Sequence, residues 1–321
     1  MSVRDYSVVI CVYTEDRWSQ ICAAIQSLRD QRLPCTEIIV VVDYNRPLYE
    51  RLLAAMPDVT VVQNTDTKGL SGARNTGVAL AGGDIIAFLD DDATAHPDWL
   101  KIIEDTYNDP AITGVGGLTI PNWQTARPWW MPEEFYWVVG CNYLGMPPSG
   151  AAVRNLLGGN MSFRREVFDI VDGFQTGIGR TANKRPLGCE ETEFCIRLAQ
   201  RSPDAVLVMD HRVRIWHFVS DKRCRFSYFL SRCYAEGISK AQVTARVGSG
   251  DGLANERRYV TRTLPLGVLT GIADLFRGHP AGLGRAGAII VGLGTTAVGY
   301  IGARLYAPKA KSDQAPQLQT T

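Results

Sequence analysis

The chain has 321 residues, of which 45% are hydrophobic and 21% are charged. This composition is typical of a folded globular protein and excludes collagen, a coiled coil and a wholly disordered chain. The formal net charge of +1 conceals an asymmetry. Residues 222–321 hold 14 Lys and Arg against 5 Asp and Glu, whereas residues 1–221 hold 20 against 28. The acidic front and the basic rear are therefore expected to face different partners.

The eight cysteines include no Cys-x-x-Cys pair. Zinc ribbons and thioredoxin-type redox sites therefore have no support, and reduced thiols are expected. The first residues do not show the charged and then apolar pattern of a signal peptide, because Met1–Asp5 is followed directly by a strand-like segment. These features predict a cytoplasmic, reducing location.

The first ninety residues alternate between short β-branched runs, which predict strands, and apolar residues at helical spacing. Strands are expected at Tyr6–Tyr13, Glu37–Asp43, Val59–Gln63 and Asp84–Leu89, and helices at Trp18–Arg29, Leu48–Met56 and Ser71–Leu80. This order predicts an α/β fold with a parallel sheet and helices on both faces. In such sheets, ligands bind beyond the carboxyl ends of the strands.

Polar residues follow three of these strands. Tyr13, Thr14 and Glu15 follow the first strand, and Asp43 ends the second. A carboxylate can accept a hydrogen bond from the N–H of a nucleotide base, and an aromatic ring can stack on that base. Taken singly, each of these residues is also compatible with an ordinary turn.

Asp90, Asp91 and Asp92 follow the apolar run IIAFL. Adjacent carboxylates at a strand end raise one another's pKa unless a cation neutralises them. Carboxylate oxygens suit Mg²⁺ or Mn²⁺, which commonly bridge protein and substrate phosphates. The competing interpretation is a solvated acidic turn that caps a helix beginning near Pro97.

Two further motifs carry candidate binding and catalytic groups. Lys68, Arg74 and Asn75 flank glycines that allow close backbone approach, and cations there suit a phosphate. Glu190 and Glu191 begin a helix-like run, where they supply either a general base or a simple helix cap.

The segments GLSGARNTGVALAGGDIIAFLDDD (69–92) and GCEETEFCIRL (188–198) resemble family 2 glycosyltransferases of the GT-A fold. With the first strand and Asp43, the resemblance covers roughly residues 6–220. It implies an inverting transferase that uses a nucleotide-diphosphate sugar, with Mn²⁺ or Mg²⁺ as the cofactor. Two positions depart from the family pattern: Tyr44 stands where a second acidic residue is common, and Glu191 replaces the usual Asp.

The resemblance also implies roles for individual residues. Asp92 would hold the metal, and Asp90 would touch the donor directly or through that metal. Asp91 would point toward the donor sugar. Glu191 would be the base, with Glu190 as its competitor.

Further roles implied by the resemblance are base contacts for Tyr13, Thr14, Glu15 and Asp43, and donor contacts for Lys68, Arg74 and Asn75. Gly159 and Asn160 would line the acceptor side. His217, whose ordinary interpretation is structural, is a third candidate metal ligand. Trp129 and Trp130 could stack on an acceptor sugar or touch lipid, and a packing role competes with both.

The rear of the chain is apolar as well as basic. A helix is expected at Arg223–Lys240 and a loop at 248–256. Leu264–Phe276 and Ala286–Ala303 are glycine-rich, and the second has 18 uncharged residues, which only just reaches the length of a membrane span. A hairpin or an interfacial pair of helices fits as well as two spans, and a buried helical subdomain or an oligomer contact competes with both.

We therefore expect three parts: a GT-A domain at 1–220, a helical membrane-associating region at 221–306 and a disordered tail at 307–321. The expected reaction is sugar transfer from a donor, favoured as a UDP-sugar, to a hydroxyl of a glycan or polyprenyl-linked acceptor. It would take place at the cytoplasmic face of the membrane. Nucleic acid is not an expected partner, and homo-oligomerisation stays open. The alternatives are a nucleotidyltransferase that makes a nucleotide sugar and a non-catalytic scaffold for envelope assembly.

Overall fold

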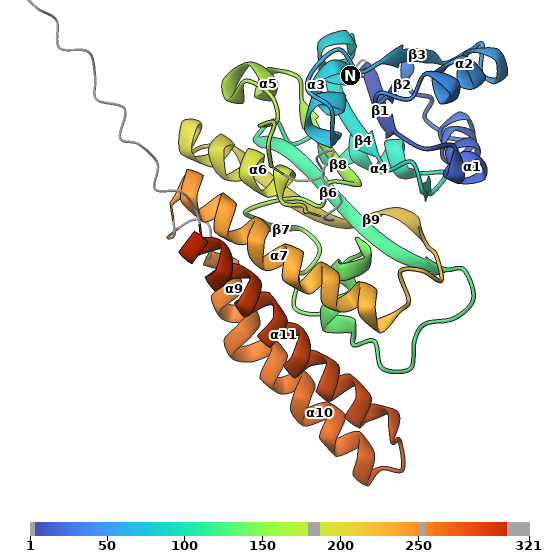
Figure 1. Ribbon diagram of the computed structural model, residues 1–321. Helices are drawn as coiled ribbons and strands as arrows, with labels where there is room; N and C mark the ends of the chain where they lie inside the picture. Colours follow the sequence, from blue (N-terminus) through green and yellow to red (C-terminus); the bar gives the residue numbers. More distant parts are fainter. Residues whose placement is uncertain (1–3, 179–186, 249, 251–253, 307–321) are drawn as a thin grey trace, which may run out of the picture.

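The computed structural model describes residues 4–178, 187–248, 250 and 254–306 (Figure 1). Its strands form one nine-stranded sheet in the order β3-β2-β1-β4-β8-β6-β9-β5, and β7 pairs with β9. The strands are β1 (Tyr6–Val12), β2 (Glu37–Val42), β3 (Thr60–Gln63), β4 (Ile85–Leu89), β5 (Ala93–Ala95), β6 (Ile112–Trp123), β7 (Ala151–Ala152), β8 (Asn160–Arg164) and β9 (Val206–Val219).

Helices cover the sheet and form a separate group at the rear of the chain (Figure 1). Those of the front part are η1 (Glu15–Arg17), α1 (Trp18–Arg29), α2 (Arg46–Ala55), α3 (Leu70–Leu80), α4 (Trp99–Thr106), η2 (Glu133–Val139), α5 (Glu166–Val171) and α6 (Glu190–Arg201). The rear holds α7 (Phe226–Val247), α9 (Ala254–Arg258), the π-helical η3 (Tyr259–Thr263), α10 (Leu264–Phe276) and α11 (Ala281–Tyr306).

The predicted parallel sheet is present in the first four strands. β1 pairs in parallel with both β2 and β4, and β2 pairs in parallel with β3. The rest of the sheet is mixed, because β8 runs antiparallel to β4 and β6, and β5 runs antiparallel to β9. The short-range pattern predicted the parallel half well, whereas the antiparallel half depends on pairings between distant segments.

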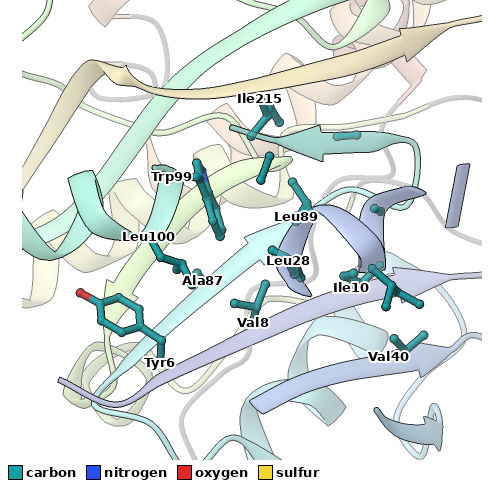
Figure 2. Packing of buried hydrophobic residues seen from close by; sticks show 14 of the residues in the cluster. Tyr6, Val8, Ile10, Leu28, Val40, Ala87, Leu89, Trp99, Leu100 and Ile215 are labelled. Atoms are coloured by element: carbon teal, nitrogen blue, oxygen red, sulfur yellow. The ribbon is translucent and has the colours of Figure 1, made fainter. Parts of the chain in front are cut away.

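The core lies on both faces of the sheet. One buried cluster joins β1 with α1, α2 and α4, and the other joins the opposite face with α3, α5 and α6. Figure 2 shows side chains of the first cluster, with Tyr6 and Val8 from β1 and Trp99 and Leu100 from α4. Burial of each large apolar side chain stabilises the fold by about 1.5–3 kcal/mol.

A third cluster joins η2 to α7, α10 and α11. Phe135 of η2 lies 5.3 Å from Phe229 of α7 between ring centroids. Segments that the sequence assigned to different parts of the chain therefore share one core. The proposed division into parts stays a prediction.

The rear helices differ in extent from the prediction. α7 begins at Phe226 and continues to Val247, where Gly248 adopts a positive φ of 89°. Residues 254–256, which were expected in a loop, begin α9. Within the described residues, α11 is the one helix long and apolar enough to span a membrane, over Ala281–Leu305 with a mean hydropathy of 1.6. The predicted disordered tail at 307–321 lies outside the described residues.

All eight cysteines are unpaired, and four of them are buried. Burial raises the pKa of the Cys11 thiol to about 12 and has the same effect at Cys195 and Cys233. These thiols are therefore protonated near neutral pH.

Asn160 connects three elements inside the core. Its side-chain oxygen accepts a hydrogen bond from the indole N–H of Trp99 at 2.8 Å, and its amide donates to the carbonyl of Val213 at 3.1 Å. Asn160 is 1% exposed. These hydrogen bonds fix α4 and β9 to β8, and the acceptor-side role of Asn160 stays a prediction.

We expect Asn160→Ala to lower the free energy of unfolding by about 2–4 kcal/mol, because it leaves two buried polar groups without partners. Urea unfolding followed by circular dichroism measures the change. Gln26→Ala, which removes an exposed hydrogen bond to Asp30, is the control and should change it by less than about 0.5 kcal/mol. Equal small effects for both variants would contradict the structural role of Asn160.

Candidate active site

The three aspartates lie in the turn between β4 and β5. β5 pairs with β9 so that Ala93 stands opposite His217, and the backbone carbonyl of Asp92 accepts a hydrogen bond from Phe218 N–H at 2.7 Å. This pairing brings β9 against the turn. His217, 125 positions after Asp92 in the sequence, therefore lies beside the aspartates.

Asp90, Asp92 and His217 form a group that fits a metal ion. One ligand atom from each lies within 4.8 Å of the others. His217 Nε2 is 3.0 Å from Asp92 Oδ1 and 4.0 Å from Asp90 Oδ2. Two carboxylates and an imidazole suit Mn²⁺, and the carboxylates also suit Mg²⁺. The structure thus brings together all three predicted metal ligands.

Two arginines also hold the aspartates. Arg223 Nη2 lies 3.0 Å from Asp92, and Arg17 Nη1 lies 3.1 Å from Asp92 and 2.6 Å from Asp91. Burial alone would raise the pKa of Asp92, but His217, Arg223 and Arg17 hold it well below its usual range. The Asp92 carboxylate is therefore ionised at every ordinary pH.

Asp91 differs from its neighbour, because burial raises its pKa to about 6 against the pull of Arg17. The motifs identified neither Arg17 nor Arg223, and no local pattern distinguishes them from other surface arginines. Only the folded chain brings them to the turn.

The predicted base-binding residues lie at neighbouring strand ends. Asp43 N–H donates to the carbonyl of Val12, so Tyr13 and Asp43 follow paired strands. The Asp43 carboxylate accepts hydrogen bonds from Gly69 N–H at 3.1 Å and from Asn64 at 2.7 Å, which fixes the loop before α3. Thr14 caps η1, and Glu15 is exposed and lies 3.6 Å from Arg51.

A cavity of about 630 Å³ lies beside the aspartate turn. Tyr13 and Thr14 from the end of β1 line one side, and the segment after β9 lines the other. Its cationic residues are Arg17, Lys222, Arg223 and Arg225. The lining also holds Asp16, Asp92 and Asp221, so its cations exceed its carboxylates by one. The four cations, next to a metal-fitting group, suit a diphosphate.

The glycine-containing loop before α3 supplies Lys68, and α3 itself supplies Arg74 and Asn75. Lys68 is exposed, with its ammonium 5.9 Å from the ring centroid of Tyr44. Asn75 bonds both the N–H and the carbonyl of Phe174, and it also donates to Asp66. Asn75 therefore supports the wall of the site through the backbone of Phe174.

Arg74 is 3% exposed and reaches across the site to α6. Its Nη1 lies 3.0 Å from Glu190 Oε1, and its Nη2 donates to the carbonyl of Gly158 at 3.1 Å. A Cβ atom at Gly158 would lie 2.6 Å from Arg74 Nη2, and one at Gly159 would lie 2.3 Å from Asp90 Oδ2. A side chain at either position would therefore displace one of these two charged groups.

A second cavity, of about 250 Å³, is lined by Asp90, Arg74, Glu190 and Glu191. Glu190 is 5% exposed and one of its oxygens has no partner among the described residues. Burial, and then the negative charge of Glu190, raise the pKa of Glu191 to about 7. A carboxyl group with this pKa is suited to accept a proton near neutral pH.

The rear helices close the other side of this second cavity. Its lining includes Trp137 and Tyr143 near η2, Tyr259 of η3 and Leu293 of α11. Lys240 of α7 also lines it and lies 2.6 Å from Glu256 of α9. The motifs did not predict this wall, and the aromatic residues that the sequence offered for the acceptor, Trp129 and Trp130, lie elsewhere.

Trp129 and Trp130 do not line this second cavity. Trp129 is 67% exposed and lies against Gly284 of α11, where a Cβ atom would be 2.1 Å from its ring. Trp130 packs on Phe226 and Phe229 with ring centroids 4.9 and 5.4 Å away. In the structure both residues pack against the rear helices.

Comparison with known proteins identifies the family. The family model described as "Glycosyl transferase family 2" matches residues 7–171. The chain is 35% identical over 238 residues to "Glucosyl-dolichyl phosphate glucuronosyltransferase" of Haloferax volcanii, covering 73% of this chain and 75% of that protein. It is also 30% identical over 129 residues to "Glycosyltransferase AglE" of the same organism, covering 37% of this chain and 42% of that protein.

Solved structures share the fold at low identity. The mannosyltransferase PcManGT from Pyrobaculum calidifontis, in complex with GDP-Man and Mn²⁺, aligns with a TM-score of 0.59 at 18% identity over 92% of this chain and 88% of that one. GalNAc-T7 with UDP, GalNAc and Mn²⁺ aligns with a TM-score of 0.52 at 17% identity, over 80% and 55%. The fold is of the GT-A type.

The chain belongs to glycosyltransferase family 2. This result confirms the resemblance to family 2 glycosyltransferases that the sequence motifs indicated. Membership of this family establishes that the protein is a glycosyltransferase. It does not specify the donor, the acceptor or the stereochemistry of transfer.

The buried pair of Arg74 and Glu190 generates a testable expectation. Arg74→Met leaves a buried carboxylate without its cation, so the free energy of unfolding should fall by about 3–5 kcal/mol. Adding Glu190→Gln to Arg74→Met should recover much of the loss, because the uncompensated charge is gone. Urea unfolding of both single variants and the double variant gives the coupling. Additive effects would contradict a direct buried pair.

Proposed function

We propose that this protein is a metal-dependent, inverting glycosyltransferase that moves a sugar from a UDP-sugar to a hydroxyl of a polyprenyl-linked glycan. The observation that carries the proposal is that Asp90 and Glu191 line one cavity, so that a metal-binding group and a base face the same space. The name of the Haloferax relative favours glucuronosyl transfer to a glycosylated polyprenyl phosphate.

In this mechanism the donor diphosphate lies in the cationic cavity beside the aspartate turn, where Arg17 and Arg223 face it. Asp90, Asp92 and His217 would hold the divalent cation. When bound, the cation offsets negative charge on the departing diphosphate.

Glu191 accepts the proton of the acceptor hydroxyl, whose oxygen attacks the anomeric carbon from the face opposite the diphosphate. One displacement inverts the configuration. Arg74 keeps Glu190 paired and in place, and the Glu190 charge helps to hold Glu191 at a pKa suited to a base.

We also propose that residues 1–220 form the transferase domain and that the enzyme works at the cytoplasmic face of the membrane. The basic charge of residues 222–321 supports contact with anionic lipid. A thermal-shift screen of UDP-, GDP- and TDP-sugars, each with and without Mn²⁺, tests the donor. Stabilisation by a GDP- or TDP-sugar alone would overturn the UDP assignment.

The base role predicts a pH profile. Glu191 accepts a proton only when ionised, so kcat/KM should rise with pH through about 7 and then level off. Glu191→Gln should lower kcat by about 10²–10⁴-fold. The control Glu193→Gln removes a carboxylate of the same helix that pairs with Arg197, and it should keep the midpoint of the profile. Full turnover in Glu191→Gln would favour a nucleotidyltransferase, which needs no base there.

The metal-fitting group predicts binding directly. Asp92→Asn or His217→Ala should weaken Mn²⁺ affinity by about tenfold or more in calorimetry, because one of three protein ligands is lost. Asp98→Asn, which changes a carboxylate paired with Arg32, should leave the affinity unchanged. A chelator should abolish transfer. Wild-type affinity in both site variants would contradict this metal site, and failure to bind any nucleotide sugar would favour a scaffold.

A further inference from the structure

One face of α11 is apolar, uncharged and exposed. Leu283, Ile290, Val298 and Ile301 recur at helical spacing along it, and Ile290 and Val298 are 60% and 62% exposed. The charged residues nearest this stretch in sequence, Arg285 and Arg304, lie near its two ends. The opposite face, which includes Ala288 and Ile289, is buried in the rear core.

α10 continues this surface. Leu266 and Leu269 are 62% and 64% exposed, and Phe276 is 84% exposed. Gly267 of α10 lies against Glu134 of η2, and Gly292 of α11 lies against Phe135 of the same segment. Both helices therefore turn one side to η2 and their exposed apolar residues away from it. Figure 1 shows them as an antiparallel hairpin that extends beyond α7.

The packing of α11 opposes a membrane span. A Cβ atom at Gly237 of α7 would lie 2.1 Å from the carbonyl oxygen of Thr296, and one at Gly299 would lie 2.2 Å from that of Tyr234. Thr296 also lines the cavity that holds Glu191. If α11 crossed a bilayer, it would have to leave α7 and open that cavity.

The turn of the hairpin opposes insertion by its tip. Arg277 and His279 are exposed there, and Asp274 pairs with Arg285. A hairpin that entered the hydrocarbon tip first would carry these charged groups with it, which is costly. The packing of α11 therefore opposes a span, and the charge at the turn opposes a plunging hairpin.

We propose that the α10–α11 hairpin lies flat on an anionic membrane surface, with its apolar face at the level of the acyl chains and its arginines among the headgroups. The length of α11, about 39 Å for 26 residues, then runs along the membrane plane. In-plane helices bind through apolar area together with attraction to anionic lipid. A second copy on the same face is disfavoured, because it would bring Arg277 and Arg304 near like charges.

This orientation gives the hairpin a second role, which rests on the proposed function. Leu293 and Thr296 line the cavity from the inner side of α11, while Ile290 and Val298 face the membrane. The cavity is therefore about one helix diameter, roughly 10 Å, from lipid. A lipid-linked acceptor can present its sugar at Glu191 while its chain stays in the bilayer.

Vesicle flotation of the full chain, without donor or acceptor, tests the membrane contact independently of activity. Vesicles of phosphatidylcholine with phosphatidylglycerol should carry the protein, and pure phosphatidylcholine should carry much less. Ile290→Gln combined with Ile301→Gln should lower partitioning by about tenfold or more, because membrane affinity scales with buried apolar area. The control, Leu53→Gln with Leu80→Gln, changes exposed leucines of α2 and α3 and should float like the wild type.

Circular dichroism and UDP-sugar binding verify that each variant is folded. Unchanged flotation of the Ile290 and Ile301 variant would overturn the proposal. The proposal would also be overturned if the wild-type protein did not float but formed a dimer, and if the Ile290 and Ile301 double variant dissociated that dimer.

Topology is tested with an epitope inserted between Gly278 and His279. Protease added outside the vesicles should cut the epitope of bound protein, because a flat hairpin keeps its turn on the side of the catalytic body. Protection of the epitope until detergent is added would show a spanning or plunging hairpin and contradict the proposal.

Discussion

The site depends on charges that are buried in pairs. A carboxylate taken out of water is strongly destabilised unless a cation or hydrogen-bond donors replace the lost hydration. Here Arg74 meets Glu190, and Asp92 meets both His217 and Arg223, each at 3.0 Å. Each pair joins segments that are far apart in the chain. The positions of the side chains around the two cavities therefore follow from the requirement that these charges neutralise one another.

The two clusters of charge divide the chemistry between them. Around Asp92, His217, Arg223 and Arg17 lower the carboxyl pKa and keep the group ionised, and the two arginines suit a diphosphate. At Glu191, burial and then the negative charge of Glu190 raise the pKa to about 7. One acidic group is thus kept ionised and the other is poised to take up a proton.

The rear helices complete this arrangement from outside the sheet. α11 packs against α7 on one face, lines the cavity through Leu293 and exposes Ile290 and Val298 on the other. The wall of the second cavity is consequently built from the same helices that carry the exposed apolar surface. That wall and the surface proposed to contact the membrane are parts of one packing unit, joined by the cluster of η2, α7, α10 and α11.

Much of the front half was predictable, because the strands, α1 and the aspartate turn follow from short-range patterns of apolar and acidic residues. Glu191 and His217 were identified by motif and spacing, and the structure brings both to the crevice. Asn160 could not be placed this way, since its role depends on Trp99 and Val213 meeting it in the fold. Arg17 and Arg223 lacked a local signal for the same reason.

Three tryptophans show most clearly that a role set by distant contacts cannot be predicted from local sequence. Trp129 and Trp130 pack against rear helices, whereas the nearby Trp137 lines the cavity. The sequence offered Trp129 and Trp130 and not Trp137, because contacts with α7, η3 and α11 decide which tryptophan reaches the cavity.

The central claim is that Glu191 and the metal-fitting group act on opposite sides of one anomeric carbon. The most direct measurement is the anomeric configuration, by NMR, of the product formed from α-linked UDP-glucuronic acid and a glucosylated polyprenyl phosphate. A β-linked product shows the single displacement that this account predicts. An α-linked product would contradict it.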